Sequence, residues 1–296
     1  MSLGLQGTRR RIASVNSTKK ITKAMQLVAT AKLKTMKKNL SATALYAQEI
    51  ESLIASLLAK LSKDQFAELF DLPKIHKKRK VHLIVTSSLG LCGGYNYNLY
   101  RHLNPLINKD NDLLVVIGSK GCNYFKNRGY NVDSRFENFT SHITYQNVEE
   151  IIKYLLYLFK KGECEVINVA YTKFKNQITF IPEFKELFPF TNLDEKVSNL
   201  SRKEKDMIVE PNALVVVKSL LPLYLKSVLY AYLNESFTSE YAARRNAMES
   251  ATDNAEEIVS KLQIEYQWYD IIHPDIYEWF SNQHFLNNDF LQRINQ

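Results

Sequence analysis

Glycine and proline, the residues that most often interrupt helices, are absent from two long parts of the sequence. Neither occurs in residues 8–72, and neither occurs in residues 223–273. Every glycine after the first seven residues lies within 90–162. Because glycine and proline weaken or end helices, their absence favours a long uninterrupted helix near each end of the chain. The middle, by contrast, is punctuated by turns.

Cysteine is also scarce, and its three copies, Cys92, Cys122 and Cys164, lie far apart. No CxxC pair and no histidine–cysteine spacing typical of a metal site occurs. The pattern argues against a zinc framework, and we expect neither a metal nor another cofactor. It favours buried, reduced thiols in a cytosolic protein.

Long apolar runs are missing as well. The basic N-terminus lacks an apolar core of signal-peptide length, and no run of about 18 uncharged apolar residues occurs. The best candidate, SLLPLYLKSVLYAYL, is interrupted by Lys226. We therefore expect no segment that spans a membrane.

Acidic residues are outnumbered by basic ones. The 296 residues contain 39 Lys and Arg against 31 Asp and Glu, a formal charge of +8. Such a balance favours an acidic partner, which can be nucleic acid, an anionic membrane or an acidic protein surface. The length suffices for one large domain or two small ones.

The first glycine-free end is expected to form a helix over about residues 8–60. Its apolar residues recur at steps of about three and four, and they are Ile12, Val15, Ile21, Met25, Val28, Met36, Leu40, Ala44 and Ala47. At 1.5 Å per residue, this helix would be roughly 80 Å long. No single globular core buries such a helix, so it must pair with another long helix or be held by partners.

The second glycine-free end supplies that mate. Its apolar residues follow a heptad seam, made of Met248, Ala251, Ala255, Ile258 and Leu262. Glu240 and Arg244 have the spacing of a favourable ion pair on one helix face. Small residues would allow close approach, and they are Ala24, Ala29, Ala31, Ala242, Ala243, Ala247, Ala251 and Ala255. We expect an antiparallel coiled coil of the N- and C-terminal helices.

The middle alternates between strand and helix patterns. Strands are expected at 80–88, 112–119 and 164–174, with helices after residue 94, after residue 119 and over 147–162. This order predicts a small Rossmann-like α/β domain with a parallel or mixed sheet. The predicted domains are therefore 1–72 (an N-terminal long helix), 73–208 (the α/β domain) and 209–296 (a C-terminal long helix with an aromatic, proline-containing tip).

Two segments invite a chemical interpretation. SSLGLCGGYN (87–96) is a strand followed by a glycine-rich turn, as in phosphate-binding loops, but it matches neither GxxxxGK[ST] nor GxGxxG. A nucleotide-using enzyme remains an alternative, and so does Cys92 as a nucleophile, although no carboxylate partner is evident. The lysine-rich helix at 18–38 allows a nucleic-acid adaptor, yet no stacking aromatic residues lie between its lysines.

Four segments together resemble the gamma subunit of F-type ATP synthase. They are RRIASVNSTKKITKAMQLVATAKLK (10–34), GLCGGYNYNL (90–99), IGSKG (117–121) and SEYAARRNAMESATDNAEEIVSKL (239–262). They occur in the family's order and at its separations over about 260 residues. The resemblance implies a non-catalytic rotor shaft, present once per complex, whose coiled coil enters a hexamer of alpha and beta subunits. The α/β domain would be the foot of this shaft, near the epsilon subunit and the membrane ring, at the cytoplasmic side of the cell membrane. The resemblance implies no nucleic-acid partner.

The resemblance also assigns roles to residues. Those matching the family's contacts with the beta subunit are Arg9, Arg10, Lys19, Lys23, Met25, Glu240 and Arg244. Acidic loops of the beta subunits would meet the lysines electrostatically. The turn that opens the first helix of the foot domain includes Gly90, Cys92 and Gly93.

The C-terminus departs from the family. After Leu262 the chain reads QIEYQWYDIIHPDIYEWF, and the family's Arg-Gln pair is replaced by Asp270 and Ile271. An alternative is therefore a gamma-like shaft of a specialised rotary ATPase motor that is not coupled to ion translocation. We expect the last helix to run to about Ile272 and to bend or restart at Pro274.

Overall fold

The structure is a computed structural model that describes residues 2–62, 64–65, 68, 79–139, 144–189, 209–210 and 212–271. The chain forms two compact units. The first, which we call the tip unit, combines residues 1–27 with residues 248–296, and the second, the body unit, contains residues 28–247. The predicted domain boundaries at 72/73 and 208/209 fall next to or within undescribed segments, so they stay predictions.

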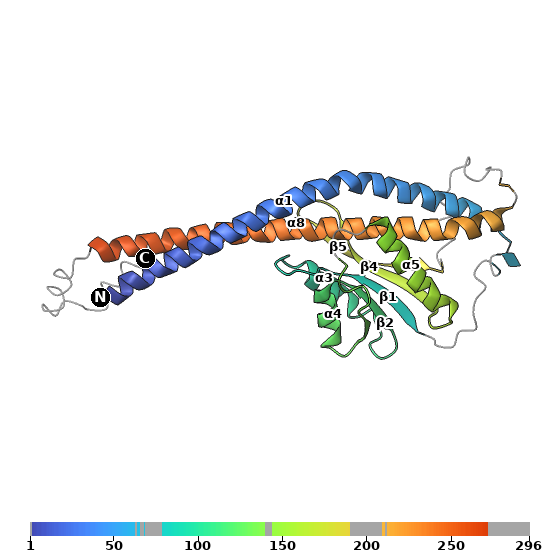
Figure 1. Cartoon of the computed structure of the whole chain (residues 1–296), viewed down its shortest axis with the longest axis horizontal. Helices are drawn as coiled ribbons and strands as arrows, with labels where there is room; N and C mark the ends of the chain where they lie inside the picture. Colours follow the sequence, from blue (N-terminus) through green and yellow to red (C-terminus); the bar gives the residue numbers. More distant parts are fainter. Residues whose placement is uncertain are drawn as a thin grey trace. The chain divides into compact units, whose positions relative to one another are not determined.

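The N-terminal helix, α1, spans Ser2–Leu58 (Figure 1). The long helix is confirmed, and it begins six residues before the predicted start at residue 8. Its buried and half-buried positions repeat every seven residues in two interleaved series. The first series is Thr8, Val15, Thr22, Ala29, Met36, Thr43 and Ile50, and the second is Ile12, Lys19, Gln26, Leu33, Leu40, Ala47 and Ile54.

This seam corrects part of the sequence-based pattern. Ile21 and Val28 were predicted to be inside, but they are 59% and 58% exposed. Ala24 and Ala31 are exposed as well. The prediction placed only apolar residues inside. The observed inward positions also include threonine, lysine and glutamine, so the apolar residues alone do not show the seven-residue period.

The C-terminal helix, α8, spans Ala213–Ile271. Asn212 caps its start, because the Asn212 side-chain oxygen accepts a hydrogen bond from the backbone N–H of Val215 at 2.9 Å. The helix continues through Pro222, which lies on the exposed face, where water can reach the carbonyl left without its donor. The helix is described as far as Ile271, and the predicted end near Ile272 stays a prediction because Ile272 lies outside the described residues. Pro274 lies outside the described residues.

In the tip unit, α8 contributes a different seam from the predicted one. Met248, Ala255 and Leu262 are buried as expected. The positions between them are Thr252 and Val259, at 5% and 7% exposure, whereas the predicted Ile258 is 47% exposed and Ala251 is only half-buried. The predicted and the observed seams both repeat every seven residues. They differ in the second residue of each repeat, which was predicted to be Ala251 and Ile258 and is observed to be Thr252 and Val259.

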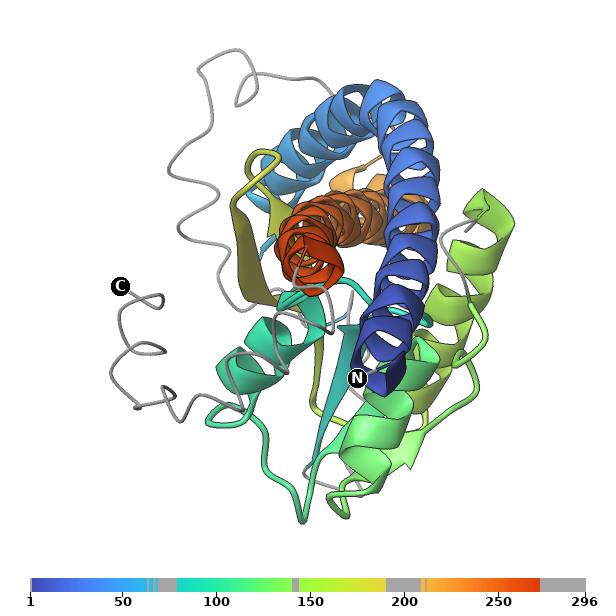
Figure 2. The same cartoon turned by 90° about the vertical axis from the view of Figure 1, so that its left-hand side faces the viewer.

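The pairing of the two helices is antiparallel. In the tip unit Lys19 contacts Glu256 and Thr22 contacts Thr252, so higher numbers on α1 meet lower numbers on α8. In the body unit, Ala29 and Leu33 of α1 pack with Ala242 of α8. The predicted antiparallel coiled coil is confirmed in each unit (Figures 1 and 2).

The body unit contains one mixed five-stranded sheet in the order β3-β2-β1-β4-β5. The strands are β1 (Lys80–Val85), β2 (Leu113–Ile117), β3 (Asn131–Asp133), β4 (Val166–Phe174) and β5 (Phe180–Phe188). β1 to β4 pair in parallel and β5 is antiparallel to β4. The three predicted strands are confirmed. The two edge strands were not predicted, because β3 is short and β5 is only partly buried.

Helices cover both faces of this sheet. Helix α5 (Tyr145–Lys160) packs in one core with β1, the second half of α1 and the first half of α8. Helices α3 (Tyr95–Leu103) and α4 (Ser119–Lys126) pack in a second core. The strands alternate accordingly: Leu83 belongs to the first core and Ile84 to the second. The Rossmann-like domain is therefore a three-layer arrangement with the two long helices on one side.

The three cysteines are buried and free, as expected. Helix α8 does contain an 18-residue window with a mean hydropathy of 1.5, long and apolar enough to cross a membrane by length and composition. The window has this hydropathy although this part of α8 carries Lys218 and Lys226, and the expectation that no segment spans a membrane stays a prediction. A core helix has the same composition, and Leu225 and Leu229 in this part of α8 are buried against the body.

Candidate functional site

The glycine loop connects β1 to α3 at the carboxyl end of the parallel strands. Leu91 and Gly93 adopt positive φ values of 60° and 55°, which reverse the chain before α3 begins after Gly94. Glycine accepts this conformation readily, whereas leucine rarely does. The prediction that GLCGG forms the turn opening the first helix of this domain is confirmed.

An ion pair on α8 lies beneath this loop. Arg244 Nη1 donates to Glu240 Oε1 at 2.7 Å, and the side chains are only 6% and 8% exposed. Arg244 Nη2 also donates to the carbonyl oxygen of Leu89 at 3.1 Å and lies 3.4 Å from that of Gly90. Burial raises the pKa of Glu240, and the charges of Arg244 and Lys32 oppose that rise. The guanidinium therefore binds the loop to α8.

The sequence predicted this pair but not its burial or its loop contacts. Glu240 and Arg244 were assigned to contacts with a beta subunit, and the structure instead places both inside the chain with partners of their own. The physical reason is that the loop covers the face of α8 that carries them. An arginine directly after the alanine pair Ala242–Ala243 was the available signal, and spacing alone could not show which segment covers it.

Cys92 points inward from the same loop. Its Sγ lies 3.7 Å from Ser87 Oγ and 3.5 Å from Asn96 Nδ2, and the residue is 3% exposed. Burial raises the pKa of the thiol. A thiol whose pKa is raised stays protonated near neutral pH and is a poor nucleophile, so the nucleophile interpretation of Cys92 has no support from this geometry.

A second polar cluster, which the sequence did not reveal, fastens α8 to α3 and β4. The Tyr95 hydroxyl lies 2.8 Å from Ser236 Oγ, which accepts a hydrogen bond from the backbone N–H of Thr172. One turn later, Ser239 Oγ donates to the carbonyl oxygen of Thr172 at 3.1 Å. Two serines three residues apart on an apolar helix face were the only available signal.

The IGSKG motif makes the close approach between β2 and the loop after β1. Gly118 has φ 93°, and a Cβ there would lie 2.3 Å from the carbonyl oxygen of Thr86. At Gly121 a Cβ would lie 2.4 Å from Thr86 Oγ1. Both positions therefore require glycine, which gives this motif a packing role.

The remaining predicted contact residues lie on α1 in the tip unit. Arg9, Arg10 and Lys23 are exposed, and Met25 is half-buried. Lys19 donates to Glu256 at 2.7 Å, with side-chain exposures of 32% and 62%. Lys19 lowers the pKa of Glu256 through this hydrogen bond and its charge. Lys19 is thus partly exposed to solvent while its ammonium binds α8.

No candidate metal centre accompanies these features in the part of the chain that the structure describes. There, no three His, Cys, Asp or Glu side chains lie close enough together to hold a metal ion. The polar contacts described above bind a loop and a sheet to one long helix.

The fold and these contacts define an antiparallel coiled-coil protein with an inserted Rossmann-like domain. The family model described as ATP synthase matches residues 4–268. The chain belongs to this ATP synthase family.

Among curated relatives, the ATP synthase gamma chain of Mycoplasmopsis synoviae is 36% identical over 86% of this chain and 89% of the relative. That of Alkaliphilus metalliredigens is 35% identical over 90% and 92%, and that of Ureaplasma urealyticum is 34% identical over 89% and 93%.

Solved structures agree in fold. A chain of the Tetrahymena thermophila mitochondrial ATP synthase central stalk and c-ring superposes with a TM-score of 0.56 at 25% identity, covering 78% of this chain and 99% of that one. A chain of the Euglena gracilis mitochondrial ATP synthase rotor gives 0.62 at 16% identity, covering 92% and 100%.

Proposed function

We propose that this protein is the gamma subunit, the rotor shaft of the central stalk, of a proton-translocating rotary ATP synthase or ATPase. It is a non-catalytic subunit that couples ATP turnover in the alpha/beta hexamer to rotation. The observation that carries the proposal is the antiparallel seam of α1 and α8, in a chain whose relatives bear the name ATP synthase gamma chain.

The seam suits a shaft that transmits torque. Close-packed small residues such as Ala29 and Ala242 (1% and 0% exposed) let the two helices approach closely. α1 continues without glycine or proline after residue 7, so the backbone has no flexible hinge there. Two helices packed along their length resist bending and twisting better than one.

Torque must also pass between the shaft and the body. The buried Arg244 contacts to Leu89 and Gly90, together with the Tyr95–Ser236 and Ser239–Thr172 hydrogen bonds, hold α8 to the α/β domain. These bonds are shielded from water, so they resist sliding of the helix along the sheet. The body would then follow the shaft as one rotor.

The proposed partners follow from the same assignment. The alpha and beta subunits would surround the tip unit, with exposed Arg9, Arg10 and Lys23, together with Lys19 and Met25, as contacts to the beta subunits. The foot would contact the epsilon subunit and the membrane ring, with one copy per complex. The protein would then be peripheral, at the cytoplasmic side of the cell membrane.

Reconstitution tests the proposal. The full chain is expected to copurify with its own alpha and beta subunits and to increase their ATPase activity. Omission of the chain is the control. A chain that remains a stable monomer beside alpha and beta subunits, and leaves their turnover unchanged, would refute the assignment.

One observation favours a second candidate, a gamma-like shaft of a specialised ATPase motor without ion translocation. The family match ends at residue 268, and the sequence beyond it carries Tyr269, Tyr277, Trp279 and Phe280. Reconstitution with a proton-translocating ring in vesicles separates the two. ATP-driven acidification of the vesicles supports the synthase, and ATPase activity without acidification supports the specialised motor.

A further inference from the structure

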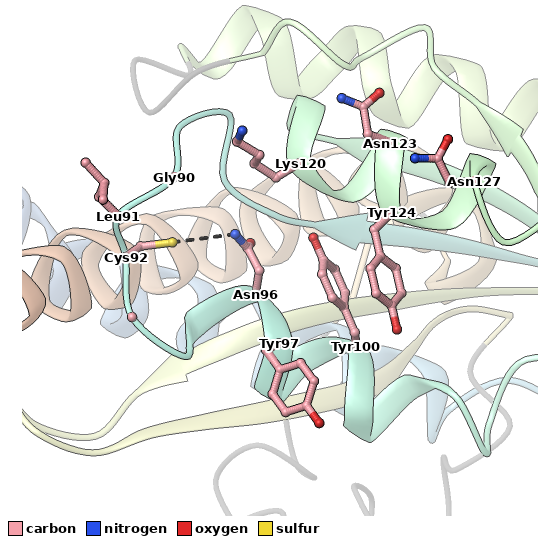
Figure 3. A pocket seen from close by; sticks show the side chains of 11 residues that line it. Gly90, Leu91, Cys92, Asn96, Tyr97, Tyr100, Lys120, Asn123, Tyr124 and Asn127 are labelled. Atoms are coloured by element: carbon pink, nitrogen blue, oxygen red, sulfur yellow. Dashed lines mark hydrogen bonds between the residues drawn. The ribbon is translucent and has the colours of Figure 1, made fainter.

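A pocket of about 430 Å³ lies on the body unit between α3, α4 and the glycine loop. Figure 3 shows its lining side chains, which come from the loop, from one face of α3 and from one face of α4. The volume is within the range of small-molecule sites. Arg244, whose contacts bind the glycine loop to α8, is not among the residues that line this pocket.

One wall of the pocket contains a buried polar group without a partner. Tyr100 is 6% exposed, and its hydroxyl oxygen makes no hydrogen bond. The Tyr100 ring stacks on that of Tyr124 with centroids 3.8 Å apart, and its hydroxyl points toward the end of the pocket near Asn96 (Figure 3). Because an unpaired buried hydroxyl is unfavourable, an acceptor supplied by a ligand would satisfy it.

The chemistry of the lining limits that acceptor. Burial raises the pKa of Tyr100, so the hydroxyl is a donor at neutral pH. Lys120, Asn123 and Asn127 line the same pocket and are exposed. The hydroxyl, the ammonium and the amides are all able to donate hydrogen bonds, and a ligand with one negative charge matches the single lysine of the lining better than a polyphosphate does.

The rest of the lining is apolar. Leu91 and Tyr97, which line the pocket, are 60% and 64% exposed. The Tyr124 ring is backed by the Arg128 guanidinium, 3.7 Å from its centroid. Tyr100 and Arg128 cover the two faces of the Tyr124 ring, so the apolar surface left for a ligand is that of Leu91 and Tyr97.

We propose that this pocket binds a small aryl or apolar carboxylate, with the carboxylate accepting hydrogen bonds from the Tyr100 hydroxyl and the Lys120 ammonium. The apolar body lies against Tyr97 and Leu91. The proposal does not depend on the rotor function, since it rests on the body unit alone.

Calorimetric titration of the full chain with hydrocinnamate tests it, with hydrocinnamyl alcohol as the uncharged analogue and ATP as a competing class. Hydrocinnamate is expected to bind saturably and at least about tenfold more tightly than the alcohol, as a charge-assisted hydrogen bond implies. No saturation at millimolar hydrocinnamate would overturn the proposal. Equal binding of the alcohol, or preferential binding of ATP, would overturn it too.

Variants locate the site. Tyr100→Phe removes a single atom that has no partner, so the protein is expected to fold, while hydrocinnamate binding weakens about tenfold. Lys120→Met is expected to weaken binding to a similar extent, and Lys126→Met, on the same helix but outside the pocket, to leave it unchanged. Unaltered affinity in both Tyr100→Phe and Lys120→Met would place any binding elsewhere and refute the assignment.

Discussion

Arg244 and Glu240 form a buried ion pair one turn apart on α8, with Nη1 and Oε1 2.7 Å apart and both side chains less than a tenth exposed. Lys261 and Glu257 have the same spacing and the same 2.7 Å distance on the same helix, but they are 74% and 64% exposed. The two pairs have the same spacing and the same distance but differ in burial, so the exposed pair serves as a control for the buried one.

Arg244→Gln is expected to lower the free energy of unfolding by about 3–5 kcal/mol, because it leaves the Glu240 carboxylate buried without its partner. It also frees the Leu89 and Gly90 carbonyl oxygens. Lys261→Gln is expected to cost much less, because that pair is exposed and screened by solvent. Urea denaturation followed by circular dichroism measures both, and equal losses in the two variants would contradict the clamp.

The Thr22 and Thr252 hydroxyl oxygens lie 2.9 Å apart within the seam of the tip unit. Each single change, Thr22→Val or Thr252→Val, is expected to destabilise the protein by about 1 kcal/mol, since it leaves a buried hydroxyl less well satisfied. The double variant places two valines at seam positions and is expected to be nearly as stable as the original. A double variant that loses the sum of both single losses would argue against direct pairing.

His82 provides a pH dependence. It is 0% exposed, its Nε2 lies 3.0 Å from Asp112 Oδ2, and its Nδ1 lies 3.3 Å from Asn168 Nδ2. Burial lowers its pKa from the ordinary 6.5, against the raising effect of Asp112. The folded state therefore binds its proton more weakly than the unfolded state does.

The sign follows from linkage: the stabilisation is fully present well above pH 6.5 and is lost as the pH falls below that value. The loss is at most about 1.4 kcal/mol per pH unit from this residue. His82→Gln is expected to flatten the decline in stability between neutral and mildly acidic pH. Thermal melting across that range measures the slope, and an equally steep decline in His82→Gln would contradict the assignment.

The glycines of the two loops are expected to differ in tolerance. Gly118→Ala places a Cβ 2.3 Å from the Thr86 carbonyl oxygen at a positive φ, so a loss of more than about 3 kcal/mol or failure to fold is expected. Gly90→Ala meets only Lys120 Cε at 3.8 Å and should be nearly neutral. Expression and melting temperature distinguish them, and a well-folded Gly118→Ala would show that the close approach can relax.

The exposed cations of the tip unit test the partner contacts. Lys23→Glu combined with Arg9→Glu is expected to lower the increase in ATPase activity of the reconstituted complex several-fold, because acidic loops would then face like charge. Lys160→Glu, exposed on α5, is the control and should leave activity unchanged. If these contacts form, the increase in ATPase activity should also fall as the salt concentration rises. Equal activity of the Lys23→Glu, Arg9→Glu variant and the Lys160→Glu control would show that Lys23 and Arg9 do not contribute to the interface.

Much of the fold could be predicted because its signals are local. The glycine-free ends, the three buried strands and the helix over 147–162 were all recovered. The edge strands β3 and β5 were missed, since three residues and a half-buried surface give little periodic signal. The heptad spacing of α8 was found, but Ile258 was chosen in place of Val259 because two seven-residue series fit the same apolar residues.

The sequence by itself determined that two long helices pair, that a turn follows β1 at GLCGG, and that Glu240 and Arg244 form an ion pair. These are short-range properties, fixed by spacing along one chain segment. Only the tertiary structure decided that this pair is buried, that threonines occupy the seam, and that Tyr100 lines a pocket with an unpaired hydroxyl. Burial depends on what a distant segment covers, and the loop over Arg244 is separated from it by about 150 residues.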